Sequence, residues 1–274
     1  MEQVIMNETS ISQAEVRKKG ISGSTIKIIA IVAMLIDHIG AVIIAGIIER
    51  SLVQQGIYSL NTSNLQELMQ FTAENGAIML INILMRLIGR IGFPIFCFLL
   101  VEGFLHTKNV TKYALRLLAF ALISEIPFDL AFNGKPFYWG YQNVFFTLFI
   151  GLLVMIAYRA IEELHIKKFI KIILDILALA AGIVISMLLK TDYGTTYGIG
   201  VICIMALYIF RKNKVHQITA GCITFIWEIT ALFAFIPIGL YNGRRGLRMK
   251  YFFYAFYPLH LFILYLIARY MGLV

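Results

Sequence analysis

Charged residues are scarce in this sequence. Asp, Glu, Lys and Arg make up 14% of its 274 residues, against roughly 25% in an average soluble domain. Hydrophobic residues account for 60%, and the mean hydropathy is +0.82. This composition excludes an ordinary soluble fold and indicates a polytopic membrane protein. The apolar runs are continuous rather than alternating, which also excludes the strands of an outer-membrane barrel.

Cysteine and acidic residues are also few. The three cysteines, Cys97, Cys203 and Cys222, all lie in apolar runs without metal-ligand spacing, so we expect small buried hydrophobic side chains and no metal site. The 15 acidic and 24 basic residues leave a net charge of +9. Because the basic residues sit in short links, we read them as marking the inner membrane side. We expect no nucleic-acid partner. The polar first 25 residues predict no cleavable signal peptide.

Apolar runs separated by polar links predict an all-α transmembrane bundle of about eight spans (eight to ten), with a polar site buried between the helices. Residues 1–25 are expected to form a flexible cytoplasmic tail, and residues 26–274 a single domain. The predicted spans are residues 27–48, 78–104, 113–132, 142–159, 172–189, 199–210, 218–240 and 251–270.

The predicted span count conflicts with the charge pattern. Basic residues before residue 28 place the N-terminus in the cytoplasm of a cell-membrane protein. Eight crossings then put the link over residues 244–250 outside, although it is among the most basic links. Either one span is miscounted, or these charges are kept for a ligand. The basic residues of this link are Arg244, Arg245, Arg248 and Lys250.

Asp37 and His38 lie in the middle of the first predicted span. A charged residue at that depth costs about 2.5–3.5 kcal/mol on insertion scales, so the pair is a candidate functional site. Neighbours on a helix point about 100° apart, so each needs its own partner on another helix. One interpretation is acid–base chemistry. The other is a structural pair that holds helices together by hydrogen bonds.

Arg86 and Arg90 share a helix face, four residues apart. Pro94 cannot donate to the carbonyl of Arg90, which predicts a kink or break there. The two arginines either extend to the membrane interface, or bind an anion, or pair with Asp37, Glu125 or Asp129. The opened backbone makes Arg90 the better candidate for a site role.

The next polar residues have both structural and functional interpretations. Glu125 and Asp129 share a face, and either cap or pair helices or belong to the site. Asn143 lies toward the same end and can donate to an oxyanion. Glu102 and Arg116 lie near the cytoplasmic side, at the interface or in a site. Asp192 sits in a short loop, where a solvated charge is the usual explanation.

Tyr257 and His260 lie well inside the last predicted span and share a face. His260 is either a buried structural histidine or a member of the site.

Five sequence blocks resemble the TraX family, named for the membrane protein that N-acetylates F-type conjugative pilin. They run in family order through most of the chain from residue 26 to residue 262. The blocks are IKIIAIVAMLIDHIG, LIGRIGFPIFCFLLVEGFLHT, YALRLLAFALISEIPFDLAF, QNVFFTLFIGLL and GLRMKYFFYAFYPLHL. The family is also similar to the wider group of transmembrane acyltransferases, which use acyl-CoA and an intramembrane histidine.

The resemblance implies acetyl transfer from acetyl-CoA to an amine or hydroxyl acceptor that the sequence does not identify. We hypothesise that His38 is the general base, oriented by Asp37 or Asp129. Arg90 and Asn143 would stabilise the oxyanion, and Tyr257 with His260 would close the site. The phosphates of CoA require a basic cluster. Candidates for it are Arg86, the link over residues 244–250, and the group Lys108, Lys112 and Arg116.

Two other classes stay open. A proton-coupled transporter also uses buried acidic, basic and histidine residues, although no inverted repeat is visible. A purely structural assembly factor would tolerate alanine at Asp37, His38 and Arg90. The route of transfer, direct or through an acyl-histidine, and the oligomeric state are undetermined.

Overall fold

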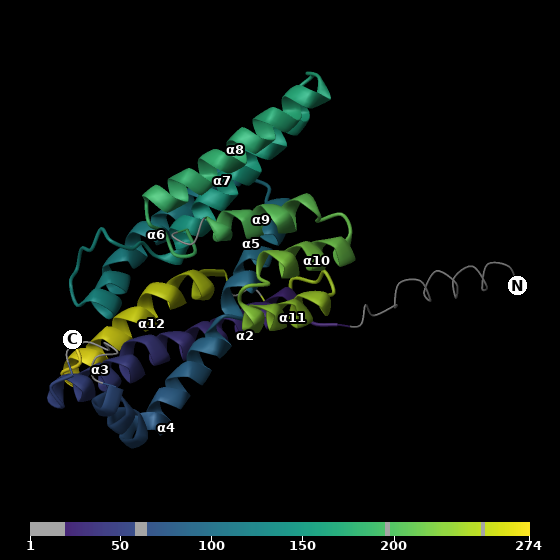
Figure 1. Cartoon of the computed structure of the whole chain (residues 1–274). Coiled ribbons are helices and arrows are strands. Elements are labelled where there is room, and N and C mark those ends of the chain that lie inside the picture. The colour runs from purple at the N-terminus through teal and green to yellow at the C-terminus, as the bar shows by residue number, and fades with distance from the viewer. Residues whose placement is uncertain (1–19, 58–64, 195–197, 248–249) are drawn as a thin grey trace, which may run out of the picture.

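The structure is a computed structural model that describes residues 20–57, 65–194, 198–247 and 250–274. All named elements in these residues are helical (Figure 1), which confirms the expected all-helical fold. Most of the predicted flexible tail, residues 1–19, lies outside the described residues. The first helix already begins at Gly23, where the Ser22 side chain accepts a hydrogen bond from Thr25 N, as a helix N-cap does.

The central element is one continuous helix of 32 residues. It consists of α2 (Gly23–Ile39), a π-helical turn η1 (Gly40–Ile44) and α3 (Ala45–Gln54). The π turn follows directly after Asp37 and His38. Such turns are rare and often occur at functional sites, because the extra residue changes the direction of neighbouring side chains.

A broken helix runs antiparallel to the central element. It consists of α4 (Leu65–Gly89) and α5 (Gly92–His106). Pairing of Asp37 with Arg86, and of Ser51 with Asn75, shows the antiparallel direction. The predicted break at Arg90 is confirmed, since Arg90 and Ile91 form the turn between α4 and α5.

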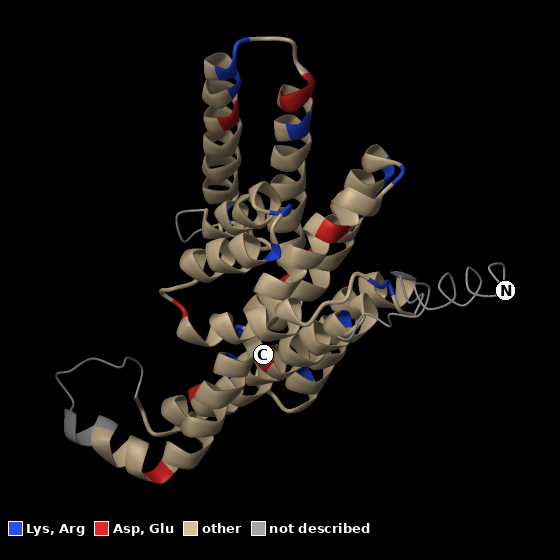
Figure 2. Cartoon of the chain, turned by 90° about the vertical axis from the view of Figure 1, so that its right-hand side faces the viewer, with Lys and Arg blue, Asp and Glu red and all other residues tan. Residues whose placement is uncertain are grey.

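Four long helices complete the bundle. These are α6 (Val110–Asn133), α7 (Val144–Glu163), α8 (Lys168–Leu188) and α12 (Lys250–Tyr270). Helix α12 packs on α6 and runs parallel to the central element, because His260 meets His38 and Met271 O accepts from Arg50. Helices α7 and α8 form a projecting hairpin (Figure 1), and charged residues gather near its tip (Figure 2).

The predicted span over residues 218–240 is wrong. This region consists of three short pieces, α10 (Lys214–Thr224), the 3-10 helix η3 (Ile229–Ala234) and α11 (Phe235–Gly239). The segment returns to where it began, since Lys214 Nζ donates to Tyr241 O at 2.9 Å. It is therefore a re-entrant hairpin. Irregular backbone at membrane depth is tolerated where it lines a polar cavity, and the break places Glu228 beside Arg90, which lines one.

The hairpin resolves the conflict in the charge pattern. Ile21 N donates to Leu240 O and Asn242 N to Ile21 O, so the link after Tyr241 lies beside the start of α2. We call this end the basic end, defined by residues 20–27, 102–116, 211–214 and 241–247. The opposite end holds the end of α3 and the chain terminus, where Arg50 donates to Met271 O.

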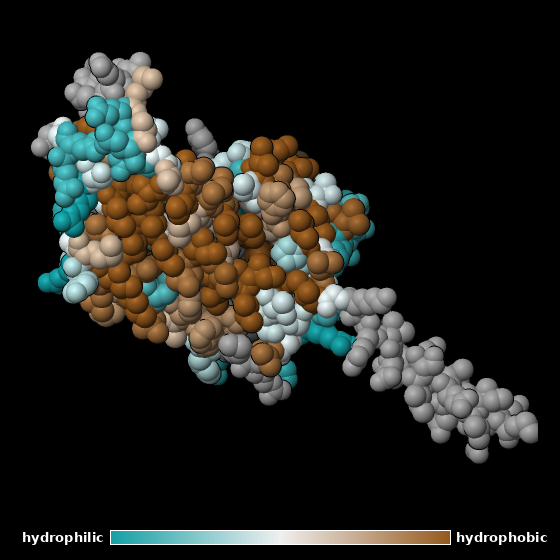
Figure 3. All heavy atoms as spheres, turned by 90° about the horizontal axis from the view of Figure 1, so that it is seen from below, coloured by the Kyte–Doolittle hydropathy of each residue, from teal (hydrophilic) through white to brown (hydrophobic). Residues whose placement is uncertain are grey.

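Five helical segments of the described residues are long and apolar enough to cross a membrane, so the expected eight are not confirmed. They are residues 23–54, 69–106, 144–163, 168–188 and 251–270. Helix α9 (Ile199–Ile209) is too short and packs inside the bundle between α5, α7 and α10. Large apolar side chains remain exposed on the outer helices, notably α8, and Figure 3 shows one broad hydrophobic face. Cys97 and Cys203 are fully buried, as expected, whereas Cys222 is only partly buried, so the expectation is wrong for that residue.

Candidate active site

A polar cavity of about 220 Å³ lies in the middle of the bundle. Residues from α2, the break between α4 and α5, α6 and α12 line it, together with the loops before α7 and α9. Among them are Asp37, His38, Arg86, Arg90, Asp192 and Tyr257. Segments far apart in the sequence therefore gather their charged groups at one place, as the sequence predicts.

His38 of the cavity wall pairs with His260 of α12. His38 Nδ1 lies 2.7 Å from His260 Nε2, and the ring planes are parallel. His260 Nδ1 lies 2.7 Å from the backbone carbonyl of Phe256. A carbonyl only accepts, so His260 Nδ1 carries a proton and, in the uncharged pair, His260 Nε2 accepts from His38 Nδ1. The tautomers are thus assigned by the network. They leave His38 Nε2 as an unprotonated nitrogen without a hydrogen-bond partner among the described residues.

Asp37 has a separate partner on α4. Its Oδ2 lies 2.7 Å from Arg86 Nη1, while its Oδ1 is buried without a partner among the described residues. A Cβ added at Gly89 would lie 2.3 Å from the Asp37 Cβ, so Gly89 permits this close approach. The expectation that Asp37 and His38 need different partners is confirmed.

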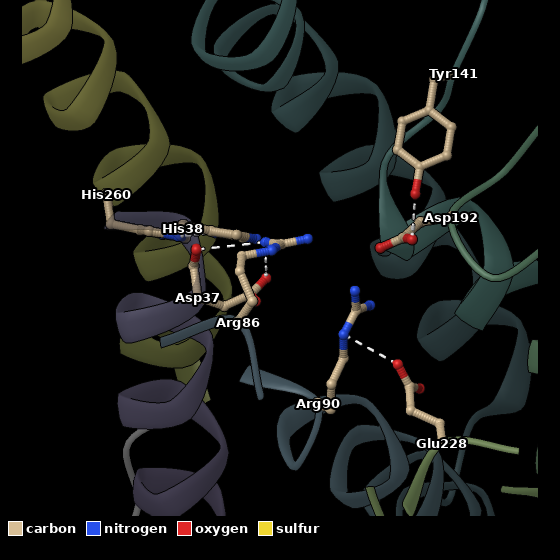
Figure 4. A network of polar contacts seen from close by, with 8 residues as sticks. All are labelled: Asp37, His38, Arg86, Arg90, Tyr141, Asp192, Glu228 and His260. Atoms are coloured by element: carbon tan, nitrogen blue, oxygen red, sulfur yellow. Dashed lines mark hydrogen bonds and ion pairs between the residues drawn. The ribbon is translucent and has the colours of Figure 1, made fainter. Parts of the chain in front are cut away.

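Arg90 pairs with a residue that the sequence did not single out. Its Nε lies 3.0 Å from Glu228 Oε1, in the break between α10 and η3. In Figure 4 the Arg90 side chain extends between the Asp37–Arg86 pair and Asp192. Neither arginine simply extends to the membrane interface. The site instead holds alternating charges from four segments.

The loop before α9 places Asp192 in the cavity wall. Gln142 N donates to Lys190 O and Asp192 N to Gln142 O, which ties this loop to the start of α7. The Tyr141 hydroxyl donates to the Asp192 carboxylate. Burial raises the pKa of Asp192, while the Tyr141 hydrogen bond and the Arg90 charge act against the rise. The expectation of a solvated loop charge is therefore wrong.

Aromatic rings close the remaining walls. Tyr257 is buried and meets the ring of His38 edge to face, with centroids 6.0 Å apart. Tyr193 has a φ of +56°, a conformation that side chains of this size rarely adopt, and stacks on Phe93 with centroids 3.7 Å apart. Aromatic walls around charged groups exclude water and strengthen their interactions.

Asn143 is not placed for the predicted oxyanion role. It is fully buried and lies outside the cavity lining. Its Oδ1 caps α7 by accepting from Phe145 N, and its Nδ2 donates to Ala121 O and to Glu125. Asp129 accepts from Tyr138 N and holds the loop after α6. Asn143, Glu125 and Asp129 therefore fix loops and helix ends rather than face the cavity.

The predicted donor-binding residues do not lie together, because some line the central cavity and others lie at the basic end. Arg86 lies in the central cavity, away from the link over residues 244–250. Arg245, Arg116 and Glu102 line a second cavity at the basic end. Arg244 lies on the same link but outside that lining. Arg248 and the side chain of Lys250 lie outside the described residues.

Three residues of the network were missed by the sequence analysis: Tyr141, Asp192 and Glu228. Tyr141 and Asp192 stand in short polar loops, and Glu228 follows Trp227 inside an apolar run. An acidic residue within such a run was the one available signal, because insertion of an unpaired carboxylate is costly.

The cavity has the groups that proton-transfer chemistry requires. It offers an unprotonated imidazole nitrogen, two arginines and the carboxyl groups of Asp37 and Asp192 within one small volume, with Glu228 paired to Arg90 at its edge. A neutral imidazole removes protons near neutral pH, and fixed guanidinium groups stabilise developing negative charge.

Comparison with known proteins gives a family match and a curated relative. The family model described as TraX protein matches residues 22–268. A relative from Dichelobacter nodosus, "Probable fimbrial assembly protein FimC, serogroup H1", is 27% identical over 197 residues, which cover 66% of this chain and 81% of the relative. No solved structure matches the chain. Since the family match covers nearly all of the described helices, the chain belongs to the TraX family.

Proposed function

We propose that this protein is an integral membrane acetyltransferase that moves an acetyl group from acetyl-CoA to an acceptor amine or hydroxyl. The observation that carries the proposal is the free Nε2 of His38, held by the His260 relay in a cavity with two arginines. The name of the D. nodosus relative concerns fimbrial assembly, so the N-terminus of a pilin-type peptide is the first acceptor to test.

In the proposed reaction, His38 Nε2 takes the proton from the acceptor as its nitrogen or oxygen attacks the thioester carbonyl carbon. The new carbon–nitrogen or carbon–oxygen bond forms, the carbon–sulfur bond breaks, and the thiolate leaves. The protonated His38 then returns the proton to the thiolate, which gives free CoA. Arg90 or Arg86 stabilises the carbonyl oxygen while it carries negative charge.

We also propose that the basic end faces the cytoplasm of a cell membrane. Basic links favour the inner side, and the re-entrant hairpin lets the links on both sides of it share that side. This orientation places the N-terminus inside.

The test is acetyl-CoA turnover by purified protein in nanodiscs with a pilin-type peptide as acceptor. Removal of a general base lowers the rate about 10²- to 10⁴-fold, so His38→Gln should lose that much. His165→Gln is the matched control, because His165 is exposed and should keep full turnover. Equal turnover in the wild type and His38→Gln would remove His38 from the mechanism.

A second candidate is a proton-coupled transporter. The observation that favours it is the broken segment at Glu228, because carriers place interrupted helices at buried charged sites. Solute counterflow in proteoliposomes without acetyl-CoA would support a carrier. Thiol release that depends on acetyl-CoA and acceptor, without counterflow, would support the transferase.

A further inference from the structure

A larger cavity of about 430 Å³ lies at the basic end. The start of α2, the end of α5, the starts of α6 and α12, α7 and the link after Tyr241 line it. This volume lies in the usual range of small-molecule sites, about 300–1,000 Å³. Its inner wall is apolar, with Phe96, Leu99, Leu117 and Leu148 among the lining residues.

The charged residues of this cavity are mainly basic. Lys27, Arg116 and Arg245 face one carboxylate, Glu102. Arg116 Nε is buried and has no hydrogen-bond partner among the described residues. Three cations and an unused buried donor fit a ligand with several negative charges, since phosphate oxygens accept strong charge-assisted hydrogen bonds.

The two cavities meet at one side chain. Among the described residues, Phe96 of α5 alone belongs to both linings. A second contact joins the two linings, since Phe145 of the larger cavity meets Tyr257 of the central cavity, with ring centroids 5.0 Å apart. A partly buried aromatic ring therefore separates the basic cavity from the cavity of His38.

We propose that the basic-end cavity is the donor site, which binds a phosphorylated acyl thioester such as acetyl-CoA, and that Phe96 limits the acyl group that passes to His38. The proposal rests on the proposed transferase function and adds to it a separate donor chamber. Lys27, Arg116 and Arg245 bind the phosphates of the donor. The apolar wall packs against the chain that links the phosphates to the thioester, and the thioester reaches Phe96. The acceptor remains in the central cavity.

Direct binding of CoA, measured by calorimetry in nanodiscs, tests the donor site without turnover. Loss of one phosphate contact should weaken binding about tenfold, so we expect this for Arg245→Ala and Lys27→Met. Arg244→Ala is the matched control, because Arg244 is the neighbouring residue on the same exposed link but lies outside the cavity lining. Its CoA affinity should equal that of the wild type. An unchanged melting temperature checks that each variant is folded.

The outcomes separate this inference from the proposed function. Wild-type binding of CoA with equal affinities for Arg245→Ala, Lys27→Met and Arg244→Ala overturns the donor site and leaves the transferase standing. No binding of CoA to the wild type overturns both. His38→Gln should bind CoA like the wild type, because His38 lies in the central cavity. A tenfold loss of CoA affinity in His38→Gln would contradict the separation of the donor site from the central cavity.

The role of Phe96 has its own readout. Phe96→Ala should raise the rate with butyryl-CoA relative to acetyl-CoA about tenfold or more, with CoA affinity unchanged. Leu99→Ala is the matched control, since Leu99 lines the basic-end cavity alone, and it should keep the wild-type preference. The same acyl preference in both variants would overturn the role of Phe96 as the partition.

Discussion

At the residue scale, the site depends on a short relay of hydrogen bonds. The Phe256 carbonyl sets the tautomer of His260, and His260 sets that of His38. In many enzymes a carboxylate orients the catalytic histidine. Here a second histidine takes that position, while the carboxylate of Asp37 forms an ion pair with Arg86. In the proposed reaction, the relay makes His260 a positioning residue.

Substitution of His260 should separate positioning from packing. We expect His260→Gln to keep part of the turnover, because its side-chain oxygen can accept from His38 Nδ1. His260→Leu should lose about tenfold more, since a buried donor without an acceptor costs about 1–3 kcal/mol. The measurement is the pH profile of kcat together with CoA affinity. Equal loss and unchanged pH profiles in both variants would show that His260 only fills space.

Asp192 should give a pH-dependent stability. Burial raises its pKa in the folded protein, so the folded state holds a proton that the unfolded state releases above a pKa of about 3.9. The wild type therefore loses stability as pH rises from that value through the raised pKa of Asp192. The Asp192→Asn variant has a side chain that stays neutral, so its stability should not fall in this pH range for this reason.

The measurement for Asp192 is thermal denaturation in detergent between pH 4 and pH 9. The melting temperature of Asp192→Asn should rise relative to that of the wild type as pH increases. Asp192→Ala removes the acceptor for the Tyr141 hydroxyl and should be less stable at every pH. Parallel curves for the wild type and Asp192→Asn would contradict the protonated carboxyl.

At the element scale, interruptions of helices build the site. A π turn follows Asp37 and His38, a break separates α4 from α5 at Arg90, and the re-entrant hairpin is broken at Glu228. Each interruption frees backbone and changes the direction of a charged side chain. An unbroken bundle would keep these side chains on separate helix faces.

Gly89 at the end of α4 is a sensitive point of this arrangement. Gly89→Ala places a Cβ 2.3 Å from the Asp37 Cβ, so the helices must separate, at a cost of about 1–3 kcal/mol for overpacking. We expect a lower melting temperature and lost turnover. Gly76→Ala in the same helix meets nothing within 4 Å and should be neutral or stabilising by up to about 1 kcal/mol. Comparable effects of both variants would refute the close contact.

At the scale of the whole molecule, the basic links gather at one end of the bundle. Lys214 donates to Tyr241 O, and Arg245 O accepts from Ser24 N, so three distant segments share this end. The opposite end holds the exposed Lys135 in the loop after α6. The arrangement agrees with the charge rule for membrane proteins only because residues 214–239 do not cross.

Cysteine labelling in sealed vesicles checks this topology. In a variant with Cys97, Cys203 and Cys222 replaced by Ser, single cysteines at Lys212 and at Gly243 should label from the same side. A cysteine at Lys135 should label from the other side. Labelling of positions 212 and 243 from opposite sides would show that the hairpin crosses the membrane.

Sequence alone determined the features that depend on local pattern. Low charge and continuous apolar runs predicted a helical membrane protein, Pro94 predicted the break at Arg90, and the spacing of Asp37 and His38 predicted separate partners. Tertiary structure alone decided which partners meet, namely Arg86, His260 and Glu228, and that Asp192 lines the central cavity. It also decided that residues 218–240 return rather than cross. Partner choice depends on the depth and rotation of helices distant in sequence, and an apolar run has the same hydropathy whether it crosses a bilayer or folds back within it.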